Sequence, residues 1–245
     1  MCEWLPVSHT LRSRFVLVLT ELVGTRRADL TNNLPYPADS PHVTIDGPDP
    51  DRVLLIGSGV MTGAGVSSHS VSIAGNLARS ISAATGRGID VDIIPIAGLV
   101  ARHAAPRLRA ISLRSYDAVV VAVGINDAII GTPRRDWRHG IRAMLSVIES
   151  TLPARGQIFL IAIADPTQTP MFRPLPARLA ARHALALNAD SRAIAREHPH
   201  MTVIDFEVGA IDDPVRLYTK ASYARWSQQL APNIIAGLNR VYSTR

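Results

Sequence analysis

The chain has 245 residues, 47% of them hydrophobic, which is enough to bury a substantial core in one large α/β domain. Its net charge of +6 comes almost entirely from arginine, since Lys220 is the only lysine. The arginines are scattered and no aromatic residues interleave with them, which argues against a nucleic-acid-binding surface. No apolar run reaches the roughly 18 residues of a membrane span, and no secretory signal pattern opens the chain. We therefore expect a soluble, cytoplasmic protein.

The first fifty residues differ in pattern from the rest of the chain. Residues 9–24 place Leu11, Phe15 and three later apolar residues on one face at helical spacing. We expect this helix to pack on the domain; the alternative is contact with a membrane or an acyl chain. Residues 25–50 are rich in Pro, Asn and Asp and are expected to form a long surface linker. The predicted organisation is an N-terminal helix and linker over 1–50 and a main domain over 51–245.

From residue 51 onwards, short apolar runs alternate with segments of helical periodicity. Strands are expected at 53–57, 91–95, 118–123, 158–163 and 202–205. Helices are expected at 66–85, 133–151, 176–197 and 221–240, and over part of 100–113. This alternation predicts a three-layer α/β/α sandwich, flavodoxin-like, with five parallel strands. Ligands of such sheets bind beyond the carboxyl ends of the strands. The candidate site therefore lies in the loops at 57–66, 96–100, 124–132, 164–175 and 207–220.

Three of these loops carry informative motifs. "IGSGVMTGAGV" follows the first predicted strand, "IAGLVAR" the second and "VGINDA" the third. Together they resemble the SGNH (GDSL-type) hydrolases, a family of esterases, lipases and acyltransferases. The most specific piece is "VGINDA", where Gly124, Asn126 and Asp127 match the family's Gly-x-Asn-Asp without a gap. "TGAGV" (62–66), "SYARWSQQLA" (222–231) and "PMFRPLPARL" (170–179) resemble the actinobacterial branch of the family.

The resemblance implies an oxyanion site. Ester cleavage passes through a tetrahedral oxyanion that preorganised hydrogen-bond donors must stabilise. In the family these donors are the nucleophile's backbone N–H, a second-loop glycine N–H and the third-loop asparagine side chain. They correspond here to Gly59, Gly98 and Asn126. The resemblance also makes Asp127 a candidate for substrate binding.

The family's nucleophile and base are not found at their usual places. When "GAGV" (63–66) is aligned with the family's usual Gly-x-Gly-x, Gly59 occupies the position of the catalytic serine. Ser58 then occupies the position of the aspartate that precedes it. Ser58 is therefore either a structural turn residue, a ligand-binding residue or a displaced nucleophile. The family's C-terminal Asp-x-x-His corresponds to the stretch "DDPVRLYTK". Its aspartate falls near Pro214 and its histidine near Leu217 or Tyr218. No histidine follows His200, and a serine hydroxyl without an imidazole is a weak nucleophile at neutral pH.

Other residues offer only partial substitutes for this pair. Asp212 and Asp213 lie near the expected aspartate position but have no following histidine to orient. His103, which follows the second loop, is the best alternative base, ahead of His69. No His, Cys, Asp and Glu cluster has metal-ligand spacing, and the first loop lacks the ending of a phosphate loop. We therefore expect no metal and no cofactor.

The loop at 164–175 is long and contains the apolar pair Met171–Phe172. We expect these two side chains to form one wall of a ligand cleft. The favoured interpretation is an SGNH-hydrolase-like protein with little or no esterase activity that binds an acyl, ester or glycosyl ligand. The alternative is an active esterase or acyltransferase that uses Ser58 with the Gly98 and Asn126 oxyanion site. The sequence does not identify the ligand, protein partners or oligomeric state.

Overall fold

The structure is a computed structural model that describes residues 34–168, 174–209 and 218–243. The helix predicted at 9–24 lies outside the described residues. So do Met171 and Phe172 of the predicted cleft wall, and Asp212 and Asp213 near the predicted base position.

The core of the fold is one six-stranded sheet with the order β1-β3-β2-β4-β5-β6. Its strands are β1 (His42–Ile45), β2 (Asp51–Gly57), β3 (Ile89–Pro95), β4 (Ala118–Ala122), β5 (Gln157–Ile161) and β6 (Met201–Ile204). The last five are mutually parallel. Taken alone, they have the flavodoxin-like order 2-1-3-4-5, in which the chain switches direction between β2 and β4. The predicted fold class is therefore confirmed.

The apolar runs of the sequence form the centre of this sheet. Val119, Val120 and Val121 of β4 are at most 1% exposed, and β5 is buried along its whole length. Strands covered by helices on both faces show such continuous apolar runs. The five parallel strands fall within two residues of the predicted ranges.

The edge strand β1 is a difference from the predicted organisation. It pairs with β3 antiparallel, with His42 opposite Asp92 and Ile45 opposite Ile89. The prediction of a plain surface linker over 25–50 is therefore wrong for these four residues. The strand was missed because it is short and only half-buried, so its alternation stands out little from the surrounding proline-rich sequence.

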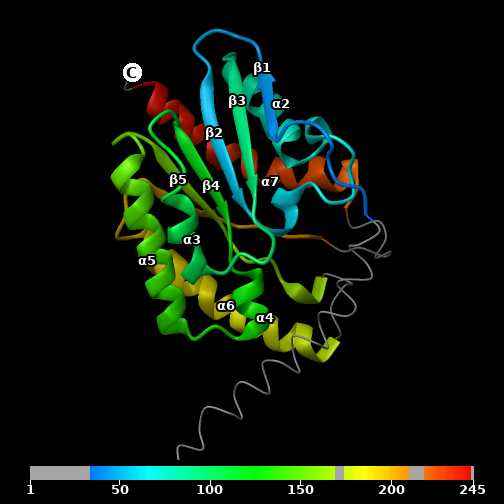
Figure 1. Cartoon of the computed structure of the whole chain (residues 1–245), viewed down its shortest axis with the longest axis vertical. Helices are drawn as coiled ribbons and strands as arrows, with labels where there is room; N and C mark the ends of the chain where they lie inside the picture. Colours follow the sequence, from blue (N-terminus) through cyan, green and yellow to red (C-terminus); the bar gives the residue numbers. More distant parts are fainter. Residues whose placement is uncertain (1–33, 169–173, 210–217, 244–245) are drawn as a thin grey trace, which may run out of the picture.

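Helices cover both faces of the sheet (Figure 1). They are α2 (Ile73–Thr85), α3 (Ala101–Leu108), α4 (Ile125–Ile130), α5 (Arg134–Thr151), α6 (Pro174–Ala195) and α7 (Lys220–Tyr242), with the short 3-10 helices η1 (Gly59–Thr62), η2 (His69–Val71) and η3 (Pro166–Gln168). One apolar core lies between the sheet and helices α2 and α7, and the other between the sheet and helices α3, α5 and α6. Within the described ranges, no helix combines the length and apolar character that a bilayer span requires.

Two helical details differ from the sequence prediction. The helix expected over 66–85 begins only at Ile73, because the Ser72 hydroxyl caps it by accepting a hydrogen bond from the Ala74 amide. The short helix α4 was not expected, since its six residues are too few to show a helical period.

Candidate functional site

The first loop of the site leaves β2 at Gly57 and is held against the end of β4. The Ser58 amide donates to the Ala122 carbonyl at 3.2 Å. Gly57 has a φ of +147°, and a Cβ there would lie 2.1 Å from the Ala122 oxygen. Only glycine allows the two strands to approach this closely. The Ser58 side chain is buried by this contact, with 4% of the residue exposed.

Gly59 is the residue at the family's serine position, and it begins η1. Its φ is +62°, in the left-handed region that favours glycine. Among the residues that the structure describes, a Cβ built on Gly59 would have no atom within 4 Å. The backbone therefore leaves open space on the side where a nucleophile would stand.

The second loop is tied to the first by a backbone hydrogen bond. The Ile96 amide donates to the Gly57 carbonyl at 2.7 Å, and the Leu99 amide closes a turn onto the Ile96 carbonyl at 3.3 Å. Gly98 lies in this turn with a φ of +70° and is exposed. In the described part of the chain, the amides of Gly59 and Gly98 donate to no backbone carbonyl.

The third loop brings Asn126 onto both other loops. Its Nδ2 atom donates to the Leu99 carbonyl at 3.0 Å and lies 3.5 Å from Oγ of Ser58. Asn126 is 8% exposed, at the start of α4. The predicted convergence of the loops after the first three parallel strands is therefore confirmed, at the point where the sheet switches direction.

Asp127 holds the second and third loops in place from beneath. One carboxylate oxygen accepts from the Ala101 amide at 3.0 Å, and the other from the Thr132 hydroxyl at 2.9 Å. The residue is 1% exposed, and this burial raises the pKa of its carboxyl group. These contacts give Asp127 a positioning role at the N-terminus of α3. Substrate contact by Asp127 stays a prediction.

A cavity of about 110 Å³ opens beside Ser58 and Gly59. Apart from Ser58 and Tyr218, its described lining consists of glycine and apolar residues from the ends of β4 and β5, η1 and the segment after β6. They are Gly59, Val60, Ala122, Val123, Ile125, Ile161, Ala162, Ile163, Ala164, Phe206 and Val208. The cavity is thus a small apolar chamber at the carboxyl edge of the sheet.

Tyr218 lines this cavity from the segment where the family's histidine is expected. Its ring packs edge-on against Trp226, with 5.9 Å between the ring centroids. Gly65 lies directly beneath it, since a Cβ on Gly65 would come 2.1 Å from the Tyr218 carbonyl oxygen. In the sequence, Tyr218 is marked only by its alignment with the family's histidine. Phe206 and Val208 were not predicted, because nothing in their pattern distinguishes a cavity wall from core.

Among the described residues, no histidine lines the cavity. His103 is exposed on α3, where its Nε2 accepts from the Arg102 guanidinium at 3.1 Å. His69 is buried in η2, and desolvation by this burial lowers its pKa. His183 contacts the Thr132 carbonyl at 2.7 Å.

An imidazole–hydroxyl contact does occur at the far edge of the sheet. His42 Nε2 lies 2.6 Å from the Thr44 hydroxyl and its Nδ1 lies 2.7 Å from the Asp92 carboxylate. The Thr44 hydroxyl itself donates to Asp90 at 2.8 Å, so its proton is directed away from the imidazole. We interpret this cluster as side-chain pairing between β1 and β3. The described residues contain no group of three or more His, Cys, Asp and Glu arranged to hold a metal ion.

The loops and their cavity correspond to a known family. The model of the GDSL-like lipase/acylhydrolase family matches residues 55–234. The chain belongs to this family. The matched range begins in β2 and ends in α7, so it includes the three converging loops and Tyr218.

Solved structures with the same fold include several esterases. A putative arylesterase from Agrobacterium tumefaciens is 20% identical with a TM-score of 0.57, over 75% of this chain and 98% of that chain. Est24, a carbohydrate acetylesterase from Sinorhizobium meliloti, is 12% identical with a TM-score of 0.57, over 76% and 99%. The M. smegmatis aryl esterase is 16% identical with a TM-score of 0.57, again over 76% and 99%. No curated protein matches the chain.

Membership of the GDSL family gives this chain an SGNH esterase-like fold. The likenesses to solved structures are all below 25% identity and concern the fold alone. Whether this family member catalyses a reaction therefore depends on its own cavity residues.

Proposed function

We propose that this GDSL family member binds a short acyl group in the cavity beside Gly59 and does not hydrolyse esters at an enzymatic rate. The observation that carries the proposal is the open space at Gly59, where no atom of the described residues lies within 4 Å of a built Cβ. The position of the family's nucleophile is accessible from the cavity, but glycine supplies no hydroxyl. Without a nucleophile, the cavity retains only its binding role.

The lining favours an acyl group over a sugar. Ser58 and Tyr218 are the two polar side chains among the described residues that line the cavity. A buried sugar would leave several hydroxyl groups without partners, and each unpaired group costs about 1–3 kcal/mol. The volume of about 110 Å³ is smaller than that of an engineered apolar cavity of roughly 150 Å³ that binds benzene. The ligand in the cavity is therefore a short alkyl or branched acyl chain.

The loops beside the cavity contain candidate donors for the ligand's oxygen atoms. The backbone amides of Gly59 and Gly98 and the side chain of Asn126 correspond to the family's oxyanion donors, and the Asn126 amide is already close to Ser58. These donors favour a carboxylate or thioester oxygen over an alkane. We expect butyrate or hexanoate to bind more tightly than an alcohol of equal length.

Calorimetric titration of the full chain with butyrate, hexanoate and N-acetylglucosamine tests the binding proposal. The carboxylates should bind and the sugar should not. Ala122→Phe, which fills the cavity, should abolish binding, whereas Ala83→Phe on the exposed face of α2 should leave it unchanged. Equal affinity for the sugar, or unchanged binding by Ala122→Phe, would contradict the proposal.

The alternative is a working esterase or acyltransferase with Ser58 as nucleophile. It is favoured by one contact, the 3.5 Å approach of Asn126 Nδ2 to Ser58 Oγ at the cavity wall. A reactive fluorophosphonate distinguishes the two proposals, because it labels an activated serine and leaves an inert one unmodified. Mass-spectrometric detection of the adduct on Ser58 would establish the alternative.

A further inference from the structure

Helix α6 exposes an unusual set of apolar side chains. In the first half of the helix, the inner side is buried through Ala177, Ala180 and Ala184. On its outer side Leu175, Leu179 and Leu185 are 69%, 54% and 71% exposed. In the part of the chain that the structure describes, every leucine, isoleucine or phenylalanine this exposed lies on α6; the other large exposed apolar residues are tyrosines. The outer face of α6 is therefore an apolar ridge.

Two arginines lie within this ridge. Arg178 and Arg182 are both exposed, and together with the three leucines they fall within about 120° of the helix circumference at 3.6 residues per turn. Residues 174–189 contain no aspartate or glutamate. The outer face of α6 over this range, which we call the α6 ridge, is thus both apolar and basic.

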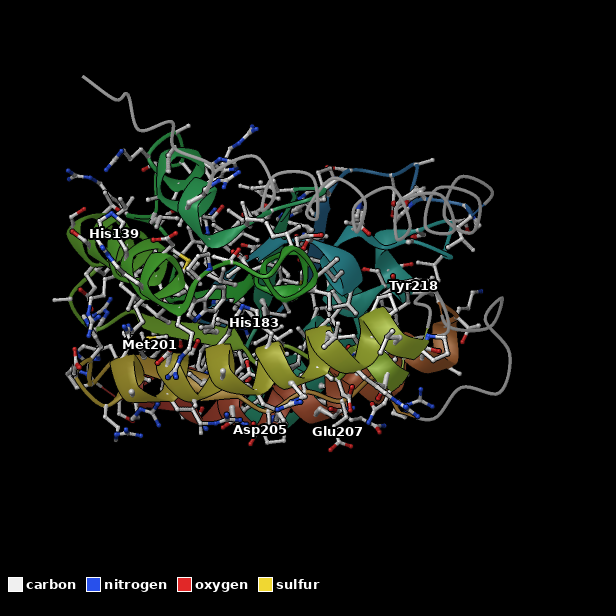
Figure 2. All side chains as sticks on the ribbon, turned by 90° about the horizontal axis from the view of Figure 1, so that it is seen from below. His139, His183, Met201, Asp205, Glu207 and Tyr218 are labelled. Carbon is white, nitrogen blue, oxygen red and sulfur yellow. The ribbon has the colours of Figure 1, made fainter. Side chains whose placement is uncertain are left out.

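Two acidic residues around the α6 ridge are paired with arginine. Asp190 is buried and binds Arg134 at 2.7 Å and Arg138 at 3.5 Å, so that cluster carries a net positive charge. Beyond it, Arg192 is paired with Asp205. Figure 2 shows α6 along the near surface of the molecule, with Asp205 and Glu207 along one edge and His183 along the other.

We propose that the α6 ridge docks this protein on an anionic lipid bilayer. The three leucines would enter the boundary between headgroups and acyl chains, and Arg178 and Arg182 would bind lipid phosphates. An outward face on which leucine and arginine interleave provides both contributions to interfacial binding, buried apolar area and attraction to anionic lipids. Anionic lipids attract such a face electrostatically.

The charge of the ridge disfavours a second copy of this chain as its occupant. An isologous dimer through this face would bring a surface without acidic residues against an identical one. Like charges that meet in an interface are destabilising. The leucines also project from an outward-facing helix surface, which suits insertion into a deformable lipid layer.

The location of the ridge relative to the cavity adds to this inference. Residues 161–164 line the cavity, and η3, which follows them, packs against α6. Tyr218, another lining residue, is labelled in Figure 2 toward the end of the molecule where α6 begins. A bilayer docked on α6 would therefore lie beside the acyl cavity. Membrane docking does not depend on the acyl-binding proposal, because the ridge contains no lining residue.

Vesicle flotation of the full chain tests the proposal. One probe is a vesicle of phosphatidylcholine with roughly 30% phosphatidylglycerol, an anionic lipid that attracts basic surfaces. The other probe is a vesicle of phosphatidylcholine alone. The wild type should bind the anionic vesicles, and binding should weaken as salt screens the charges. Arg178→Gln/Arg182→Gln should lower the partition coefficient by roughly 20–30-fold, since each basic residue near an anionic surface contributes about fivefold.

Two further variants separate the apolar and electrostatic contributions. Leu175→Gln/Leu179→Gln should weaken binding by at least about tenfold, because leucine contributes through buried methylenes. The matched control is Arg107→Gln/Arg109→Gln, which removes the same charge from an exposed site at α3 and should bind almost as well as the wild type. All variants keep the cavity residues, so their titration with hexanoate should equal that of the wild type.

Three outcomes would overturn the proposal. The first is absence of wild-type flotation, or equal flotation of the ridge and control variants. The second is equal binding to both kinds of vesicle. The third is ridge-dependent binding of an acidic polypeptide such as polyglutamate, or ridge-dependent self-association in sedimentation, in a protein that does not bind vesicles. Either result would assign the ridge to a protein partner.

Discussion

Nδ2 of Asn126 lies 3.5 Å from Oγ of Ser58 and 3.0 Å from the Leu99 carbonyl oxygen. The asparagine therefore joins the loops after the first three parallel strands and contacts Ser58, which lines the cavity. Ser58 is buried in the same arrangement, with its backbone amide bonded to Ala122. In this geometry Ser58 is an acceptor that orients the asparagine, and the first prediction separates this structural role from that of a nucleophile.

The first prediction compares these two residues. In hydrolysis of p-nitrophenyl acetate, we expect the wild type to show at most a residual rate, because binding and oxyanion donors alone give roughly 10³–10⁴-fold acceleration over water. Asn126→Ala should lower that residual rate by about 10²-fold through the lost oxyanion donor, whereas Ser58→Ala should leave it almost unchanged. A strong wild-type rate that Ser58→Ala abolishes would instead identify Ser58 as the nucleophile.

The second prediction concerns reconstruction of a nucleophile and base. Gly59→Ser places a hydroxyl in the open space of the cavity, at a cost of about 1–2 kcal/mol for a side chain in the left-handed conformation. This variant should remain unlabelled by a fluorophosphonate, because no histidine lines the described cavity. Gly59→Ser/Tyr218→His should gain labelling at residue 59, since both residues line the same cavity. Labelling of the single variant would show that another group serves as base.

The third prediction concerns the support beneath Tyr218. A Cβ on Gly65 would lie 2.1 Å from the Tyr218 carbonyl oxygen, and the φ of Gly65 is +84°. Gly65→Ala should therefore destabilise the fold by about 2–5 kcal/mol through backbone strain and overpacking. It should also weaken hexanoate binding by displacing the cavity wall.

Gly86→Ala is the matched control for this change. Gly86 also has a positive φ, +69°, but a Cβ there would have no atom of the described chain within 4 Å. It should cost only about 1–2 kcal/mol of strain and leave ligand binding unchanged. Chemical denaturation and calorimetry of the two variants provide the comparison. Equal destabilisation by Gly65→Ala and Gly86→Ala would show that the close approach of residue 65 to Tyr218 does not affect the free energy of unfolding.

The fourth prediction is a pH dependence at Asp190. Its hydrogen bond with Arg134 lowers the pKa of the Asp190 carboxyl group in the folded state. The stabilisation is therefore fully present above the ordinary value of 3.8 and is lost as the pH falls through the lower folded-state pKa. Asp190→Asn should destabilise the protein at pH 7 by about 1–3 kcal/mol.

The comparison for Asp190 is made between pH 7 and acid. The stability difference between wild type and Asp190→Asn should shrink as the pH is lowered below 3.8. Denaturant midpoints at a series of pH values measure it. A difference that stays constant down to the acid limit would show that the ion pair with Arg134 contributes nothing.

Much of the fold follows from local sequence pattern. The apolar runs that became β2, β4 and β5 are buried on both faces, so their hydrophobicity is visible without knowledge of their neighbours. The glycines at 57, 98 and 124 mark backbone conformations that other residues rarely adopt. The "VGINDA" motif predicted the location of Asn126 and its convergence with the first loop.

What the sequence did not determine depends on contacts between distant segments. β1 is defined by its pairing with β3, and its own four residues are half-buried and unremarkable in pattern. The positioning contacts of Asp127 join it to Ala101 across 26 residues of chain. The cavity walls at Phe206, Val208 and Tyr218 meet Gly59 only because the parallel strands end at one edge of the sheet. Sequence by itself determined the strands, the glycine turns and the absence of a serine at residue 59. Tertiary structure alone decided which side chains surround that glycine, because a cavity is formed by residues that are far apart in the chain.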